Sequence, residues 1–306
     1  MPQPVVGIIG LGIMGGAMAH ELLKVGYRVS GFDVRAAACQ RLQTAGGKAL
    51  RSASAVAQAS DIIIVSVSTS AALRATVTAL ATVPPRADGP ARIVIETSTL
   101  PLADKQHALK TLQGAGMKVL DCPISGTAVR LKERAWTVYA SGNKTAFKQI
   151  ESLLRVFTDN LPYVGTFGNG TKMKFAANHL VAIYNVAYAE SVTLARKMGL
   201  DPQEVIKLFG PSAVLGTGVM RLRMPMMAQR HYTPPTMKVE VWQKDMQVIG
   251  DMAKAVDCPT PLFSACVPIY SAAMAQGWAQ EDTASVGEVL ASMAGLAPRP
   301  KPVRRA

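Results

Sequence analysis

The sequence predicts an α/β Rossmann N-terminal domain with a mostly parallel, doubly wound sheet, followed by an all-α C-terminal domain. Three observations support this fold class. A GxGxxG turn at residues 10–15 directly follows an apolar run, short apolar runs alternate with helical segments up to about residue 165, and residues 171–198 contain neither proline nor glycine. Alternating strands and helices are typical of a parallel sheet with crossover helices, and the later segment is typical of a long helix.

Each element of the first domain has its own signal. The run at residues 61–67 is apolar on both faces, as expected of an interior parallel strand. After the first strand, Met14, Met18 and Leu22 recur on one helical face, and Gly26 ends that helix. Strands are expected at residues 5–9, 27–32, 61–67, 92–96, 117–120, 136–140 and 163–164.

Beyond Gly170 the apolar spacing is helical throughout. We therefore expect three regions: an NAD(P)-binding Rossmann domain at 1–166, a helical substrate and dimerisation domain at 167–296 led by a long interdomain helix, and a basic, proline-rich, disordered tail at 297–306. Helices of the second domain are expected at 171–198, 202–209, 239–255, 262–276 and 281–293.

Composition narrows the class of protein. Of 306 residues 49% are hydrophobic and 17% charged, which indicates a folded chain. The longest apolar runs are far shorter than the about 20 residues of a membrane span, and no basic segment precedes the first one. The four cysteines form no CxxC pair or metal-like spacing. We expect a cytoplasmic protein with reduced thiols, no metal and no membrane contact.

The net charge of +13 has three explanations: nucleic-acid binding, attraction of anionic ligands, or solubility. Outside the tail the basic residues are scattered singly and are not interleaved with aromatic side chains. This pattern disfavours nucleic acid as a partner. The tail itself contributes Arg299, Lys301, Arg304 and Arg305.

The turn at residues 10–15 predicts a dinucleotide site because it lies between an expected strand and an expected helix. Gly10 permits the tight turn, Gly12 lets the backbone approach a pyrophosphate, and Gly15 lets the helix pack on the strand. The free N–H groups and positive dipole of the helix start favour phosphates. The expected cofactor loop comprises Gly10, Leu11, Gly12, Ile13, Met14 and Gly15.

Asp33 follows Gly15 by 18 residues, near the spacing of a carboxylate that binds the adenosine ribose of NAD. Its charge would repel the 2′-phosphate of NADP. Arg35 could instead accommodate that phosphate. We favour NAD and leave NADP open.

The segment Val6-Gly-Ile-Ile-Gly-Leu-Gly-Ile-Met-Gly-Gly-Ala-Met-Ala19 closely resembles the opening of the β-hydroxyacid dehydrogenases. That family includes 3-hydroxyisobutyrate dehydrogenase, tartronate semialdehyde reductase, glyoxylate and succinic semialdehyde reductases and, more distantly, 6-phosphogluconate dehydrogenase. The resemblance extends to about residue 295, with three further motifs in the family's order.

The first motif, Asp121-Cys-Pro-Ile-Ser-Gly-Thr127, is similar to the family's substrate loop D-x-P-[VI]-S-G-G. The match implies that Ser125 and the backbone of Gly126 hold the substrate carboxylate. Thr127 replaces the second glycine, so we expect a narrowed or reshaped pocket. Arg134 also stands where the family has glycine.

The second motif, Gly168-Asn-Gly-Thr-Lys-Met-Lys-Phe-Ala-Ala-Asn178, is similar to the family's G-x-G-x-x-x-K helix start. Its register selects Lys174 over Lys172 as the catalytic lysine. Lys174 and Asn178 are also four residues apart and therefore share a helix face. Ala177 replaces the family's first asparagine, which removes one polar group from the expected substrate site.

The third motif, Trp242-Gln-Lys-Asp-Met246, implies that Lys244 lies near the nicotinamide and that Asp245 orients the catalytic lysine. The alternative is that Lys244 and Asp245 are simply an exposed charge pair on a helix. The turn after the fourth expected strand is similar to a family turn that contacts the cofactor, which implies a cofactor contact by Thr99. The resemblance also implies that the loop at Val67 and Ser68 contacts the cofactor through its backbone.

Together these residues imply hydride transfer between a nicotinamide and the hydroxyl-bearing carbon of a short β-hydroxy acid or its semialdehyde. Lys174 would act as general acid and base, since burial beside a cationic ring lowers a lysine pKa from its usual value of about 10.4. Asn178 would bind the substrate oxygen or orient Lys174. The long apolar helix implies a homodimer or homotetramer. The alternatives are an inactive relative, an imine reductase, or a cofactor-binding protein that uses its basic surface for nucleic acid or protein.

Overall fold

The structure, a computed structural model, describes residues 3–87, 89–128, 131 and 133–297. The predicted tail at 297–306 lies outside the described residues from Pro298 onward. The chain forms two compact units, Met1–Phe175 and Ala176–Ala306.

The first unit contains a seven-stranded sheet with the order β3-β2-β1-β4-β5-β6-β9. All neighbouring strands are parallel except β9, which pairs antiparallel with β6. The order reverses direction at β1 and β4, as in doubly wound dinucleotide-binding sheets. The predicted fold class is therefore confirmed. The strands are β1 (Val6–Ile9), β2 (Val29–Phe32), β3 (Lys48–Ala49), β4 (Ile62–Val65), β5 (Ile93–Glu96), β6 (Lys118–Asp121) and β9 (Ser141–Gly142).

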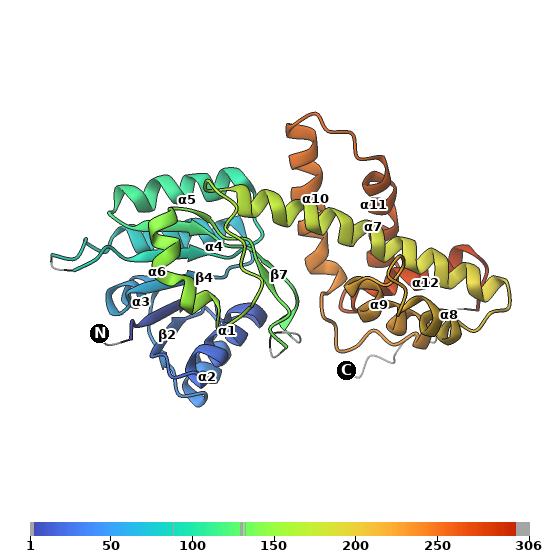
Figure 1. The fold of residues 1–306 in the computed structure, drawn as a ribbon, viewed down its shortest axis with the longest axis horizontal. Coiled ribbons are helices and arrows are strands. Elements are labelled where there is room, and N and C mark those ends of the chain that lie inside the picture. Colours follow the sequence, from blue (N-terminus) through green and yellow to red (C-terminus); the bar gives the residue numbers. More distant parts are fainter. Residues whose placement is uncertain (1–2, 88, 129–130, 132, 298–306) are drawn as a thin grey trace. The chain divides into compact units, whose positions relative to one another are not determined.

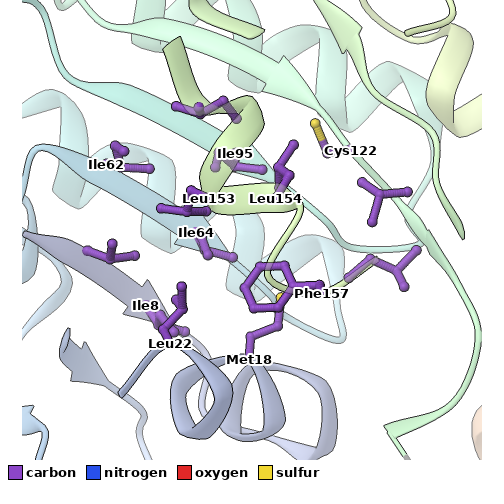
Figure 2. Close-up of a cluster of buried hydrophobic side chains, with 14 of the residues drawn as sticks. Ile8, Met18, Leu22, Ile62, Ile64, Ile95, Cys122, Leu153, Leu154 and Phe157 are labelled. Atoms are coloured by element: carbon purple, nitrogen blue, oxygen red, sulfur yellow. The ribbon is translucent and has the colours of Figure 1, made fainter. Parts of the chain in front are cut away.

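Helices cover both faces of this sheet (Figure 1). Side chains alternate between faces along a strand, so Ile62 and Ile64 join one core while Ile63 and Val65 join the other. In the first core, Met18 and Leu22 lie near the strand side chains (Figure 2). One face carries α1 (Ile13–Lys24), α2 (Ala36–Thr44) and α6 (Lys144–Leu154), and the other carries α3 (Ala53–Ala59), α4 (Ser70–Ala81) and α5 (Leu102–Gly114).

The two expected strands at 136–140 and 163–164 do not join the main sheet. The pattern at 136–140 yields only β8 (Thr137–Val138), which pairs with β7 (Ile124–Ser125) in a separate two-stranded sheet. The pattern at 163–164 yields a single bridge between Ala140 and Tyr163. The apolar side chains in these segments are buried without a long ladder; Trp136, for example, is 1% exposed.

The second unit is helical. The helix α7 (Asn169–Lys197) begins in the first unit and continues into the second as one 29-residue helix. Among the described residues, no helix is both long and apolar enough to cross a membrane. The other elements are α8 (Pro202–Phe209), α9 (Gly218–Gln229), α10 (Val239–Ala255), α11 (Pro261–Ala275), a 3-10 turn (Thr283–Ser285) and α12 (Val286–Met293).

One helix, α9, has no counterpart among the helices that the sequence predicts. Pro225 lies inside it, and proline normally argues against a helix interior. The hydroxyl of Thr217 accepts a hydrogen bond from the Met220 N–H at 3.0 Å and caps the helix start. Buried Met220 and Met224 anchor one face. Capping and burial together outweigh the hydrogen bond that proline removes.

Candidate active site

The carboxyl ends of β1, β2, β4, β5 and β6 lie at one edge of the sheet in the first unit. In sheets of this topology, ligands bind at that edge, where the strand order reverses. The structure places the predicted cofactor loop, Asp33, the Val67 loop, the Thr99 turn and the substrate loop directly after these five strands. Residues far apart in the sequence therefore share one edge.

The glycines of the cofactor loop have different surroundings. A Cβ on Gly10 would lie 2.2 Å from the Ser66 carbonyl oxygen, and one on Gly15 would lie 1.9 Å from the Gly10 carbonyl oxygen. These two positions therefore admit only glycine. A Cβ on Gly12 would lie 3.5 Å from its nearest neighbour, the Arg35 guanidinium, which is an ordinary van der Waals contact with a flexible side chain.

The start of α1 fits the pyrophosphate of a dinucleotide. Gly12 is the N-cap, so no side chain caps the helix, and the first turn of α1 carries no acidic residue. The first turn comprises Ile13, Met14 and Gly15, whose N–H groups lie at the positive end of the helix dipole. A helix start without a side-chain cap suits a phosphate-bearing cofactor.

Asp33 follows β2 and is fixed from three directions. Its Oδ2 accepts a hydrogen bond from the Leu11 N–H at 2.8 Å, and its Oδ1 accepts from the Arg35 N–H at 2.9 Å. The Arg35 guanidinium also donates to both oxygens, at 3.1 and 3.2 Å. Burial raises the pKa of Asp33, but these hydrogen bonds outweigh it and hold the pKa below its usual value. A carboxylate thus stands beside the cofactor loop, and Arg35 is engaged with it.

A cavity of about 410 Å³ opens between α1 and α2, next to the cofactor loop. Its floor is apolar, and its lining includes Gly12 and three basic side chains, His20, Arg35 and Arg41. It lies wholly within the first unit and extends the surface around the predicted cofactor site.

The loops after β4 and β5 are held together. The Val67 N–H donates to the Ser98 hydroxyl at 3.0 Å, and the Ser98 N–H donates to Glu96 Oε1 at 2.9 Å. These bonds fix the backbone at Val67 and Ser68 against the turn that carries Thr99. The two cofactor contacts implied by the family resemblance therefore lie on neighbouring, tied segments.

The substrate loop is shaped by Trp136. A Cβ on Gly126, whose φ is 144°, would lie 2.5 Å from the Trp136 ring, so this position requires glycine. The Trp136 indole N–H donates to the Thr127 carbonyl oxygen at 2.7 Å. Ser125 ends β7 and is partly exposed. The Thr127 hydroxyl is buried and has no hydrogen-bond partner among the described residues.

The two candidate lysines on α7 have different environments. Lys174 is 8% exposed, whereas Lys172 is exposed. Asn178, one helical turn beyond Lys174, is 4% exposed. A buried polar side chain is costly unless it is hydrogen-bonded or paired.

Asn178 is bonded to the pair on α10. Its side-chain amide donates to Asp245 Oδ2 at 2.9 Å, and the Lys244 ammonium lies 2.8 Å from Asp245 Oδ1. Asp245 is buried, at 3% exposure. Asp245 therefore contacts Asn178 directly. The orientation of Lys174 by Asp245, which the family resemblance implies, stays a prediction.

Four polar residues that the sequence reasoning did not single out lie beside these segments. Lys105, Glu96 and Thr171 are buried and join Asp121, which had entered only as the first letter of a motif. The sequence does contain a signal for this cluster. Glu96 ends one expected strand and Asp121 directly follows the next, so each places an acidic side chain at the end of an apolar run.

Comparisons with known proteins cover almost the whole chain. Residues 5–165 match the family described as the NAD binding domain of 6-phosphogluconate dehydrogenase, and residues 168–290 match the NAD-binding domain of NADP-dependent 3-hydroxyisobutyrate dehydrogenase. L-threonate dehydrogenase of Escherichia coli O6:H1 (strain CFT073) is 29% identical over 94% of this chain and 95% of its own. Human mitochondrial 3-hydroxyisobutyrate dehydrogenase is 29% identical over 93% of this chain and 86% of its own length. The crystal structure of 3-hydroxyisobutyrate dehydrogenase from Salmonella typhimurium has a TM-score of 0.81 and 28% identity, and the match covers 94% of this chain and all of that one.

Proposed function

This chain belongs to the β-hydroxyacid dehydrogenases, the NAD(P)-binding family of 3-hydroxyisobutyrate dehydrogenase that acts on CH–OH groups, and on that premise we propose that Lys174 is its general acid and base. The observation that carries the proposal is the burial of Lys174 one turn before buried Asn178, while Lys172 is exposed. Oxidation of a hydroxyl carbon requires a base for the hydroxyl proton, and a buried amine is suited to that task.

The roles of the other residues follow from their positions. The bound dinucleotide would supply the hydride acceptor or donor. Ser125 and the Gly126 backbone would hold the substrate carboxylate, which fixes the reacting carbon. Asn178 would bind the substrate oxygen, and Asp245 would fix the orientation of the Asn178 amide. Thr99 and Lys244 would contact the cofactor.

We propose NAD as the cofactor. A cofactor phosphate on the adenosine ribose would approach Asp33, whose lowered pKa keeps it ionised at neutral pH. Arg35, which could bind such a phosphate, already donates to Asp33. The negative charges of the Asp33 carboxylate and of the 2′-phosphate would repel each other, which disfavours NADP binding.

The substrate class that we propose is a short hydroxy acid with small substituents. Thr127 places a β-branched side chain where the related loop has glycine, which narrows the space after Ser125 and Gly126. L-threonate and 3-hydroxyisobutyrate, named for the relatives above, are both short acids of this kind.

The test replaces each lysine by alanine. Lys174→Ala should keep dinucleotide affinity and lose turnover by at least about a hundredfold, the usual worth of general acid–base catalysis. Lys172→Ala, two residues away and exposed, is the matched control and should keep wild-type turnover. Steady-state kinetics and dinucleotide titration of both variants make the measurement. Near-wild-type turnover of Lys174→Ala would remove Lys174 from the mechanism.

A further inference from the structure

Two buried carboxylates stand side by side at the functional edge of the sheet. Glu96 ends β5 and Asp121 ends β6, and the two residues are direct neighbours in the parallel register. Both side chains are buried, at 3% and 0% exposure. Adjacent buried carboxylates repel each other and would be strongly unfavourable without a compensating charge.

Lys105, on α5, supplies that charge. Its ammonium lies 2.6 Å from Glu96 Oε2, 2.7 Å from Asp121 Oδ1 and 2.8 Å from the Thr171 hydroxyl. The contacts with Asp121 and Thr171 are hydrogen bonds, and the contact with Glu96 is an ion pair. Lys105 is fully buried. Burial lowers the pKa of Lys105, but the two carboxylates outweigh it and hold the pKa above its usual value.

Asp121 binds the first turn of α7. Its Oδ2 accepts from the Thr171 N–H at 2.8 Å, and its Oδ1 accepts from the Thr171 hydroxyl, also at 2.8 Å. The neighbouring Ser141 hydroxyl accepts from the Gly170 N–H at 3.0 Å. A carboxylate at a helix start satisfies free N–H groups and complements the helix dipole. The start of α7 is therefore bonded to the end of β6, and Lys174 lies three residues further along that helix.

Glu96 binds the turn on the other side of the cluster. Its Oε1 accepts the Ser98 N–H at 2.9 Å, and the Ser98 hydroxyl in turn accepts the Val67 N–H. The same three charges thus join the turn before Thr99, the start of the substrate loop and the start of α7. All these contacts lie within the first unit.

A contribution to folding stability alone does not explain the buried ion cluster of Lys105, Glu96 and Asp121 well. Buried ion clusters are often no better for stability than apolar residues of the same volume, because desolvation offsets the attraction. Their distinctive property is directional geometry, since each oxygen and each proton fixes a partner. Here the partners are the segments that carry the proposed catalytic and cofactor-binding residues.

We propose that Lys105, Glu96, Asp121 and Thr171 are positioning residues that fix Lys174 relative to the Thr99 turn and the substrate loop. The proposal rests on the role proposed above for Lys174. The Thr171 hydroxyl is the critical link, because it accepts from Lys105 and donates to Asp121.

Three variants isolate this link. Thr171→Val keeps the shape and the backbone N–H but removes the hydroxyl. Thr171→Ser restores a hydroxyl and serves as the conservative rescue. Ser60→Ala is the matched control, because it also removes a buried hydroxyl hydrogen bond of the first unit, the 3.0 Å contact with Ser30, but at the opposite end of the sheet. Thermal unfolding of all three identifies any general loss of stability.

The first readout needs no activity. Reductive methylation with formaldehyde and cyanoborohydride, followed by peptide mass spectrometry, measures the labelling rates of Lys174 and Lys172 in each folded protein. Loss of the two buried hydrogen bonds of the Thr171 hydroxyl should raise Lys174 labelling in Thr171→Val about fivefold and leave Lys172 unchanged. Thr171→Ser and Ser60→Ala should resemble wild type. Equal Lys174 labelling in Thr171→Val and Ser60→Ala would overturn the proposal.

The second readout separates the two proposals. Thr171→Val should lower kcat about tenfold with little change in the KM for the dinucleotide, since a small misplacement of a catalytic group impairs chemistry more than binding. A lower kcat in Ser60→Ala at equal thermal stability would contradict the specific role of the cluster. If Lys174→Ala keeps turnover while Thr171→Val still changes Lys174 labelling, the catalytic role fails and the positioning contact stands.

Discussion

At the scale of one residue, Arg134 has a backbone conformation that favours glycine. Its φ is 53°, in the left-handed region that side chains other than glycine rarely adopt. The guanidinium donates to both carboxylate oxygens of Asp159, at 3.1 and 2.6 Å, and to the Arg155 carbonyl at 2.7 Å. These contacts hold the Arg134 side chain against the segment at residues 155–159.

Asp33 decides cofactor choice in our proposal. Asp33→Asn keeps an acceptor for the Leu11 N–H and removes the charge. Loss of one repulsive charge should raise kcat/KM for NADP⁺ relative to NAD⁺ by about tenfold, equivalent to about 1.4 kcal/mol. Initial rates with both cofactors measure this ratio.

Asp61→Asn is the control, because Asp61 likewise accepts from a backbone N–H, that of Val5, and from an arginine, Arg86, but precedes β4 at the other end of the sheet. An unchanged cofactor ratio in Asp33→Asn, or the same change in Asp61→Asn, would show that Asp33 does not select the cofactor.

At the scale of elements, the sequence pattern correctly predicted the helices and strands whose signals are contiguous in the sequence. The β1 strand, the glycine turn and α1 follow from contiguous signals, and α8 and α10 have the expected bounds. The helix α9 and the paired β7 and β8 depend on tertiary burial, which overrides proline and short length. In the site, spacing along α7 placed Lys174 and Asn178 on one face. The Lys105 cluster could not be found in this way, because its members come from two strands and two helices that only the tertiary fold brings together.

The helical unit contains a buried ionic contact that should control its acid stability. Asp282 Oδ1 lies 3.2 Å from the Arg223 guanidinium, and Oδ2 accepts from the Thr236 N–H and hydroxyl, both at 2.7 Å. Burial raises the pKa of Asp282, but Arg223 and these hydrogen bonds outweigh it and hold the pKa below its usual value of 3.8. Because the folded pKa is lowered, this contribution to stability is present above the usual value and is lost as pH falls through the folded pKa.

Asp282→Asn leaves the Arg223 charge buried without its carboxylate partner. The free energy of opening of α9 and α12, measured by amide hydrogen exchange, should therefore fall by about 3 kcal/mol at pH 7. The difference from wild type should shrink as the pH falls below 3.8. Hydrogen exchange of peptides from these helices makes the measurement. Glu204→Gln, which removes an exposed pair with Lys207 in the same unit, should have no effect. A difference that persists at low pH would refute the assignment.

At the scale of the whole molecule, apolar side chains remain exposed on the helical unit. They include Leu194 at 59%, Leu208 at 70% and Val214 at 88%. Apolar surface of this kind supports our proposal of a homodimer or homotetramer. Sedimentation equilibrium that found only a 32.4 kDa species would contradict it. The net charge of +13 suits the attraction of an anionic cofactor and a carboxylate substrate.

The proposed reaction can be tested directly by turnover. Purified protein would be assayed by nicotinamide absorbance with NAD⁺ or NADP⁺ and L-threonate or 3-hydroxyisobutyrate, and with NADH or NADPH and glyoxylate or succinic semialdehyde. We predict turnover of at least one of these short acids, with NAD(H) preferred. Dinucleotide binding without turnover of any member of the panel would contradict the proposed oxidation of a short hydroxy acid.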